Sequence, residues 1–299
     1  VDQITLICNI ATYKKMSSKV VLRANAKINL TLDILGKRSD NYHDIQGYVA
    51  FLELCDELII SRSEKLSVSF ENPFYEKIST TSNTIIKLHS YLSGYFPNLY
   101  QYKVNVKKNI PVSAGLGGGS CDAAAFMRYI IRDSKINMDE IDTQSLAKNV
   151  GADIPCCLKS KPSYISGIGE IIEDVKLRSA YFCILVNPHI PVSTKKIYEM
   201  IGVKKSEAVH MQNFLQKPSI DHIINGKNDF EDIIAQDYPL IREIIGFIAG
   251  TEGCIFARMT GSGPTCFGLF SKQDEMLRCQ NDLEKKYPKF WIMATKLLN

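Results

Sequence analysis

The stretch from Pro111 to Ala125 constrains the fold of this chain more than any other part of the sequence. It is rich in glycine and runs directly into the helix-forming segment 123–127; the glycines are Gly115, Gly117, Gly118 and Gly119. Glycine permits positive φ and a close approach by a ligand, and the first turn of a helix offers unpaired N–H groups. The pattern therefore predicts a glycine-rich loop that leads into a helix and binds an anion, most simply phosphate. A flexible turn that only starts a helix is the alternative.

Two common phosphate-binding loops do not fit this stretch. A Walker A loop ends in Gly-Lys-Ser/Thr, whereas Gly119 is followed by Ser120 and Cys121. A dinucleotide-binding loop has the pattern G-x-G-x-x-G/A, and the two registers that start at Gly115 or Gly117 end on Ser120 or Asp122. The loop therefore belongs to neither of these types.

Strands and one helix are expected before the loop. The alternation of Ile28, Leu30, Leu32 and Ile34 predicts a strand over 28–34, with Lys27 at its entrance. Asn83 and its neighbours are typical of a helix N-cap and predict a helix over 84–95. Apolar runs predict further strands over 20–22, 48–54, 57–61, 66–70 and 102–106, and the helix after the loop is expected to end near 133.

The second half of the chain is expected to alternate strands and helices around another glycine turn. Strands are predicted over 181–186 and 290–295, with helices over 194–200, 229–234, 239–249 and 273–286. The segment 257–270 reads as strand, turn and strand, with Gly261, Ser262 and Gly263 in the turn. This turn either reaches the phosphate loop or only closes a hairpin. A domain boundary is placed near residue 175, which divides the chain into 17–175 and 176–299.

Composition excludes several classes of protein. The chain has 299 residues, 45% of them hydrophobic, and a net charge of +4 with scattered lysines, which does not indicate a nucleic-acid-binding face. It contains no run of about 18 apolar residues, so no membrane span is expected. The first 16 residues have neither the basic start nor the cleavage site of a secretory signal, and they are expected to be an extension or the result of a misplaced start codon.

The cysteines indicate free thiols. The nine cysteines form no C-x-x-C pair, which argues against a zinc site or a redox dithiol. Most lie in apolar stretches, where a thiol behaves as a small hydrophobic side chain. A reducing compartment such as the cytoplasm is therefore expected.

Two polar motifs have ambiguous roles when they are considered alone. Asp153 follows Gly151 and precedes an apolar run, and an aspartate in such a place is usually a cap or a turn residue. Tyr42 and His43 lie in a polar turn, where such a pair is usually exposed on the surface and has no specific role.

Taken together, five motifs resemble the GHMP small-molecule kinase superfamily, which includes galactokinase, homoserine kinase and mevalonate kinase. They are Ala26-Lys27-Ile28-Asn29-Leu30, Asn41-Tyr42-His43, the glycine loop from Pro111 to Ser120, Gly151-Ala152-Asp153-Ile154-Pro155 and Gly261-Ser262-Gly263. They occur in the same order as in the superfamily and span residues 19 to about 270. The resemblance implies an α+β fold of two domains. The N-terminal domain would have a mixed sheet and the phosphate loop, and the C-terminal domain would be an α+β sandwich.

The resemblance also implies catalytic and nucleotide-binding residues. Asp153 would be the base that takes the proton from a substrate hydroxyl, and Lys27 would keep that aspartate ionised and stabilise the attacking oxygen. ATP, with Mg²⁺, would lie along the loop formed by Pro111, Val112, Ser113, Ala114, Gly115, Leu116, Gly117, Gly118, Gly119, Ser120 and Cys121.

The substrate implied by the resemblance is a small sugar alcohol that carries a cytidine diphosphate group. Tyr42 and His43 would meet the cytosine, with Tyr198 on the opposite side of the ring, and Asn29 would touch the sugar alcohol. The full set of substrate-binding candidates is Asn29, Tyr42, His43, Thr194, Tyr198, Gly261, Ser262 and Gly263. The protein is expected to be a monomer or a weak homodimer that binds neither nucleic acid nor membrane.

Two alternatives remain, and three positions depart from the superfamily pattern. Another small-alcohol kinase of the mevalonate or homoserine type is the first alternative, and a catalytically silent nucleotide-binding protein is the second. Asn25 replaces a usual proline, Cys121 loses a hydroxyl, and Asp122 adds a negative charge unless it caps the helix or meets the metal. The metal ligands are therefore left open.

Overall fold

The computed structural model describes residues 14–16, 19–71, 78–177, 180–192, 197 and 220–298. Contacts between Cα atoms divide the chain into two compact units that interleave along the sequence. Unit 1 holds Val1–Lys27, Leu54–Val112 and Gly117–Ser160, and unit 2 holds Ile28–Glu53, Ser113–Leu116 and Lys161–Asn299. The predicted domain boundary near residue 175 stays a prediction.

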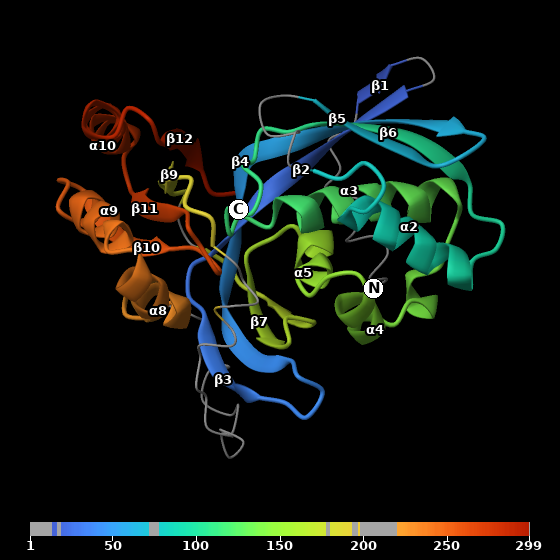
Figure 1. The fold of residues 1–299 in the computed structure, drawn as a ribbon, viewed down its shortest axis with the longest axis horizontal. Helices are drawn as coiled ribbons and strands as arrows, with labels where there is room; N and C mark the ends of the chain where they lie inside the picture. Colours follow the sequence, from blue (N-terminus) through green and yellow to red (C-terminus); the bar gives the residue numbers. More distant parts are fainter. Residues whose placement is uncertain are drawn as a thin grey trace. The chain divides into compact units, whose positions relative to one another are not determined.

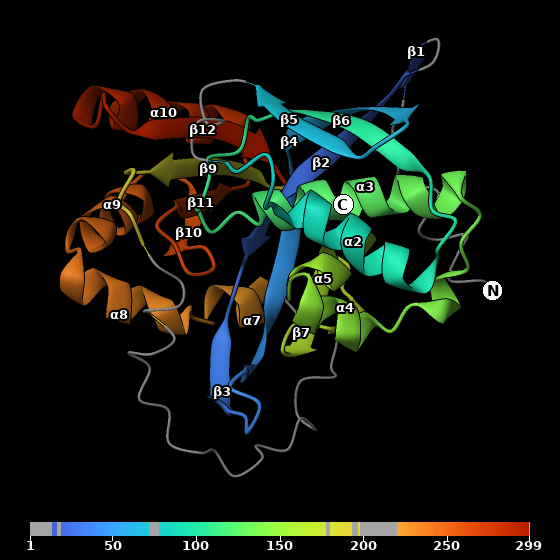
Figure 2. The same ribbon diagram turned by 45° about the vertical axis from the view of Figure 1, so that its right-hand side comes forward.

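Unit 1 combines strands with helices that lie on one side of them (Figures 1 and 2). The strand order in its sheet is β1-β2-β4-β6-β5, and β5 and β6 are parallel while β4 and β6 are antiparallel. The strands are β1 Lys14–Met16, β2 Lys19–Asn29, β4 His43–Ser63, β5 Ser67–Glu71 and β6 Gln101–Lys107. The helices are α2 Thr84–Tyr95, α3 Gly118–Asp133, η2 Met138–Glu140, α4 Thr143–Asn149 and α5 Ile154–Lys159.

The buried face of β6 explains why these helices pack where they do. Tyr102, Val104 and Val106 alternate along the strand and are fully buried, and Tyr102 meets Phe126 of α3 edge to face. The helix predicted over 84–95 is confirmed as α2, and Asn83 caps it by accepting a hydrogen bond from the Ile86 N–H at 3.1 Å. The sheet is mixed, as expected.

Unit 2 contains a four-stranded antiparallel sheet, together with three short strands that pair with the start of β4 or with each other and so belong to the same eight-stranded sheet as β4. The sheet order is β10-β11-β9-β12, with α9 packed on β10 and β11 and with α10 packed on β9 and β12. The strands are β3 Asp33–Lys37, β7 Ser163–Gly167, β8 Ile171–Asp174, β9 Phe182–Asn187, β10 Cys254–Met259, β11 Cys266–Phe270 and β12 Trp291–Lys296. The helices are α7 Ile220–Ile224, α8 Asp229–Asp237, α9 Leu240–Ala249 and α10 Gln273–Lys286. This combination of a sheet with helices agrees with the α+β fold expected for the C-terminal part of the chain.

The strand predicted over 28–34 is wrong, because the chain leaves β2 at Asn29 and resumes as β3. The N–H groups of Leu30 and Thr31 both donate to the Tyr48 carbonyl, at 2.7 and 3.3 Å, so the strand pairing is interrupted there. Gly47 permits this close approach, since a Cβ at that position would collide with the Thr31 carbonyl. Ile28, Leu30 and Leu32 are still buried and Ile34 is half-buried, but only Ile28 lies in β2 and only Ile34 lies in β3.

Two further differences concern polar or short segments. The strands predicted over 48–54 and 57–61 are one continuous strand, β4, because the buried Asp56 side chain finds hydrogen-bond partners and does not break it. Helix α5 was not predicted, since six residues are too few to establish a helical period. Most of the helix expected over 194–200, including Thr194 and Tyr198, lies outside the described residues.

Candidate active site

The glycine loop leads into a helix that begins within the glycine cluster. Gly115 and Gly117 have φ values of 75° and 66°, and α3 starts at Gly118 rather than in the alanine-rich segment. Gly117 is the N-cap residue in a left-handed conformation, which a residue with a side chain rarely adopts. The first turn of α3 therefore contains Gly118, Gly119 and Ser120, whose N–H groups are of the kind that binds anions at helix starts.

Lys27 and Asp153 form an ion pair in unit 1. Lys27 lies near the end of β2 and is buried, and its Nζ is 3.1 Å from Asp153 Oδ1. Burial is the largest single effect and lowers the pKa of Lys27, but the charge and hydrogen bond of Asp153 together with the nearby Cys156 and Cys157 outweigh it, so the pKa is raised and the ammonium stays charged. The Asp153 side chain is 39% exposed, so it is accessible to a substrate.

Asp153 lies at the N-cap position of α5. It precedes Ile154, the first residue of that helix, but within the described residues its side chain makes no capping hydrogen bond. Its carboxylate instead meets Lys27, which the residue pattern alone did not indicate. A side-chain carbon added at Gly151 would lie 3.7 Å from Ser120 Oγ, so the segment that carries Asp153 lies against the first turn of α3.

Lys27 also contacts the phosphate loop. A Cβ at Gly117 would lie 3.3 Å from the Cε of Lys27, so the lysine stem packs directly on this glycine. In unit 1 the structure therefore brings together Lys27, Asp153 and the second half of the loop. A basic group, an accessible carboxylate and a set of helix N–H groups are the parts that phosphoryl transfer requires.

The first half of the loop lies in unit 2, where it meets the second glycine turn. The Thr260 hydroxyl accepts a hydrogen bond from the Asn29 N–H at 2.9 Å and donates one to the Gly115 carbonyl at 3.3 Å. Gly261 has a φ of 53°, and a Cβ there would lie 3.1 Å from the Gly115 carbonyl oxygen and 3.3 Å from Asn29 Oδ1. The turn from Gly261 to Gly263 thus both closes the β10–β11 hairpin and contacts the loop.

Thr260 was missed in the sequence, although it is fully buried and joins three parts of unit 2. The available signal was its position directly before the Gly261 turn. Asn228 was missed as well. Its side-chain amide donates to the carbonyls of Met259 and Gly261, each at 2.8 Å, and so supports the same turn.

Tyr42 and His43 lie at the β3–β4 hairpin, away from Asn29. The Tyr42 carbonyl accepts from the Arg38 N–H at 2.7 Å, and His43 begins β4. Leu30, next to Asn29, bonds to Tyr48, which is five residues further along the strand, so roughly 17 Å of strand separates His43 from that point. Burial and the charge of Lys37 lower the pKa of His43, which favours a neutral imidazole.

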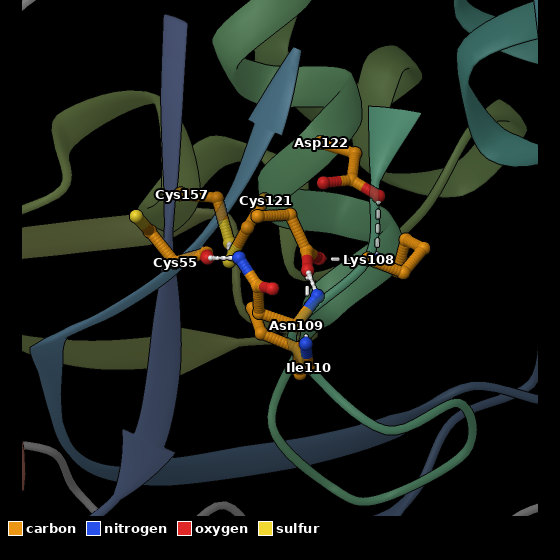
Figure 3. Close-up of polar contacts among 8 residues, drawn as sticks. Cys55, Lys108, Asn109, Ile110, Cys121, Asp122 and Cys157 are labelled. Carbon is orange, nitrogen blue, oxygen red and sulfur yellow. Dashed lines mark hydrogen bonds and ion pairs between the residues drawn. The ribbon is translucent and has the colours of Figure 1, made fainter. Parts of the chain in front are cut away.

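The two unusual loop positions face the interior of unit 1 (Figure 3). Cys121 and Cys157 are buried thiols with their sulfurs 3.4 Å apart, and Asp122 pairs with Lys108 at 2.8 Å. Asp122 therefore neither caps α3 nor is exposed to a bound metal. Every cysteine within the described residues is free, as expected.

Magnesium is compatible with this arrangement. Among the described residues, three or more His, Cys, Asp or Glu side chains nowhere gather as a metal cage. Mg²⁺ bound with a nucleotide needs only one or two carboxylates in addition to the phosphates, and Asp153 is an accessible carboxylate of this kind.

Two family matches define the class of protein. The GHMP kinases N terminal domain matches residues 83–161, and the GHMP kinases C terminal domain matches residues 219–289. The first match contains the glycine loop and Asp153, and the second contains Thr260 and the turn that follows it. The chain belongs to the GHMP kinases.

Within that family, curated proteins named 4-diphosphocytidyl-2-C-methyl-D-erythritol kinase are similar to this chain over most of its length. The chain is 30% identical over 288 residues to the 4-diphosphocytidyl-2-C-methyl-D-erythritol kinase of Bradyrhizobium sp. (strain ORS 278), with 92% of this chain and 96% of the relative covered. It is 32% identical to the enzyme of the same name from Rhodopseudomonas palustris (strain BisB5), with 92% and 98% covered.

Solved structures show the same fold. A crystal structure of 4-(cytidine 5'-diphospho)-2C-methyl-D-erythritol kinase superposes with a TM-score of 0.70 at 24% identity, covering 93% of this chain and 99% of that one. The homoserine kinase from Cytophaga hutchinsonii superposes with a TM-score of 0.63 at 12% identity, covering 95% and 96%. Along the described residues, no helix is both long and apolar enough to cross a membrane.

Proposed function

We propose that this chain transfers the γ-phosphoryl group of ATP to the 2-hydroxyl of 4-diphosphocytidyl-2-C-methyl-D-erythritol, in the methylerythritol phosphate route to isoprenoid precursors. The observation that carries the proposal is the Lys27–Asp153 ion pair, 3.1 Å long, with Lys27 packed on Gly117 of the phosphate loop. The names of the similar curated proteins support the choice of substrate.

In this mechanism Asp153 takes the proton of the attacking hydroxyl. The Lys27 ammonium lies 3.1 Å from that carboxylate, and it would stabilise the attacking oxygen as negative charge develops there. Phosphoryl transfer needs positioning and charge stabilisation more than covalent chemistry, and these two side chains provide both on the acceptor side.

The phosphates of ATP would lie along residues 111–121. The N–H groups of the first turn of α3 would face the phosphates, and the positive end of the helix dipole adds to their attraction. Mg²⁺ bound with the nucleotide supplies neutralising charge, and Asp153 is the residue of this site suited to contact it.

The residues of unit 2 would bind the acceptor substrate. Asn29 and the turn formed by Gly261, Ser262 and Gly263 would contact the sugar alcohol, whereas Tyr42 and His43 would bind the cytosine. The strand length between His43 and the neighbour of Asn29 suits an elongated substrate with a nucleobase at one end. A neutral His43 can both donate and accept hydrogen bonds, as recognition of a base edge requires. Thr194 and Tyr198 complete the proposed set.

The proposal includes the setting of the enzyme. It would act as a monomer or a weak homodimer in the cytoplasm, on a small-molecule substrate and without nucleic acid or membrane as a partner. The free thiols within the described residues agree with a reducing compartment.

Replacing Asp153 by Asn tests the central role. Asp153→Asn is expected to lower kcat by about a hundredfold to ten-thousandfold, the usual contribution of a positioned general base, while ATP binds within about twofold of the parent. The measurement is steady-state turnover together with calorimetric binding of ATP.

Asp142→Asn is the matched control. Asp142 also precedes a helix, α4, but its side chain caps that helix by accepting from the Gln144 N–H at 3.0 Å. Asn is an equally good cap, so turnover of this variant should equal that of the parent. If Asp153→Asn retained turnover within a few-fold of the parent, Asp153 would not be the base.

A further inference from the structure

Three charged side chains are buried together at the base of the phosphate loop, and Figure 3 labels two of them, Lys108 and Asp122. They are Lys108, Asp56 and Asp122, whose side chains are 3%, 0% and 3% exposed. Lys108 Nζ donates to Asp122 Oδ2 at 2.8 Å and also to Asp56 Oδ2. The mechanism proposed above assigns no chemical step to any of the three.

Asp56 fixes the segment that enters the loop. Its Oδ1 accepts hydrogen bonds from the N–H groups of Asn109 at 2.6 Å and Ile110 at 2.9 Å, just before Pro111. The Asn109 side chain donates to the Cys55 carbonyl at 2.9 Å, which adds a second link to the same strand. Strand β4 therefore holds the segment that enters the loop through two of its residues, Cys55 and Asp56.

Asp122 connects the other end of the loop to the same point. It lies in the early part of α3, and its bond to Lys108 ties this helix to the entering segment. A Cβ at Gly118 would lie 3.4 Å from Lys108 Nζ and 3.2 Å from the Ile110 side chain, so the two ends are in direct contact. The cluster thus closes the loop at its base.

The unequal number of negative and positive groups indicates that the cluster positions the chain more than it stabilises the fold. Two carboxylates share one ammonium, and Asp122 Oδ1 has no hydrogen-bond partner within the described part of the chain. Burial raises the pKa of Asp122 to about 7; Lys108 opposes this shift and Asp56 adds to it. Buried ion clusters are often no more stabilising than apolar side chains of similar size, and in some proteins they specify one arrangement of the chain.

We propose that Lys108, Asp56 and Asp122 are positioning residues for ATP, because they clamp the two ends of the phosphate loop and so hold the first-turn N–H groups of α3 in place. This inference rests on the proposed function, in which those N–H groups meet the phosphates. Loss of the clamp should weaken ATP binding in the ground state and the transition state alike, so it should raise the KM for ATP more than it lowers kcat.

The experiment compares Asp122→Ala and Asp122→Asn with the parent. Alanine removes the link to Lys108, whereas asparagine keeps an oxygen that accepts from it. Asp122→Ala should raise both the KM for ATP and the calorimetric Kd by about tenfold, which corresponds to roughly 1.4 kcal/mol, and should change kcat by less than about threefold. Asp122→Asn should stay within about twofold of the parent, because the link is retained.

Asp133→Ala is the matched control at the other end of the same helix. Asp133 ends α3 and bonds to Arg62 and to the Tyr102 hydroxyl, so its loss should lower the melting temperature without altering the KM for ATP. If Asp122→Ala does not fold, Asp122→Ser takes its place, since serine is too short to reach Lys108.

Three results would contradict the proposal that these residues position the loop for ATP. They are an unchanged KM for ATP in the Ala and Ser variants, an equal rise in Asp133→Ala, and an equal rise in Asp122→Asn. A parent that neither binds nor consumes ATP would instead contradict the proposed function. Calorimetry on the parent separates the two failures.

Discussion

The Lys27 ammonium is buried with the Asp153 carboxylate 3.1 Å away, and that carboxylate is the largest of several effects that raise the pKa of Lys27 against the effect of burial. Asp153 alone in the sequence looked like a helix cap, and only the family resemblance made it a base. The geometry agrees with the second interpretation in one respect: the carboxylate meets Lys27 and, within the described residues, does not cap α5. The catalytic role itself remains a proposal.

Asp122 should make the stability of the protein depend on pH. Burial, together with Asp56, outweighs the attraction of Lys108 and raises the pKa of Asp122 from its ordinary value of 3.8 to about 7 in the folded protein. The folded state therefore binds a proton that the unfolded state releases between these values, and the stability it contributes is present below pH 4 and is lost as the pH rises through 7.

The measurement is urea unfolding of the parent and of Asp122→Asn at about pH 5 and about pH 8. The free energy of unfolding should fall more steeply with pH in the parent than in the variant, which has no carboxyl at this position. Parallel curves would show that Asp122 does not titrate in this range.

At the scale of elements, the phosphate loop requires glycine at positions where a helix can do without it. Gly115 combines a φ of 75° with a Cβ position that would collide with the Thr260 carbonyl. Gly246, in the middle of α9, has open space around it, and a side chain there would meet no atom within 4 Å among the described residues. The two positions offer a direct contrast.

Alanine should therefore destabilise the protein at Gly115 and stabilise it at Gly246. Gly115→Ala should lower the free energy of unfolding by more than about 1 kcal/mol, because alanine is strained at positive φ and has no room. Gly246→Ala should raise it by about 0.5–1 kcal/mol through helix propensity. Urea unfolding measures both changes, and equal effects of the two substitutions would refute the argument from space and φ.

Elements with strong local signals were predictable, and those shaped by distant contacts were not. Helices α2 and α10 follow from periodicity and from their boundaries, and the observed ranges match the expected ones closely. The break after Asn29 was not predictable, since it depends on Tyr48 and on the close approach at Gly47. The continuity of β4 depends on partners of Asp56 that lie more than 50 residues away.

At the scale of the whole molecule, the two compact units are not consecutive stretches of chain. Strands β2 and β4 pass from one unit to the other, and the phosphate loop is divided as well, since Ser113–Leu116 belong to unit 2 and the loop residues on either side belong to unit 1. A search for linkers along the sequence cannot detect such an arrangement, because no composition change marks it. The family matches at 83–161 and 219–289 identify an N-terminal and a C-terminal part without defining the boundary between them.

The candidate site was predictable only in part for a similar reason. The family motifs brought Lys27, Asp153 and both glycine turns into consideration, and the structure adds their contacts within each unit. Thr260, Asn228 and the Lys108 cluster were missed, because a polar residue inside a strand or beside a turn carries no local mark of its partners.

The most direct test of the account is the consumption of ATP by the purified protein with four acceptors: 4-diphosphocytidyl-2-C-methyl-D-erythritol, mevalonate, homoserine and galactose. The proposed binding of cytosine by Tyr42 and His43 predicts turnover with the first acceptor alone. Turnover with mevalonate, homoserine or galactose and not with the cytidine-linked substrate would contradict the account.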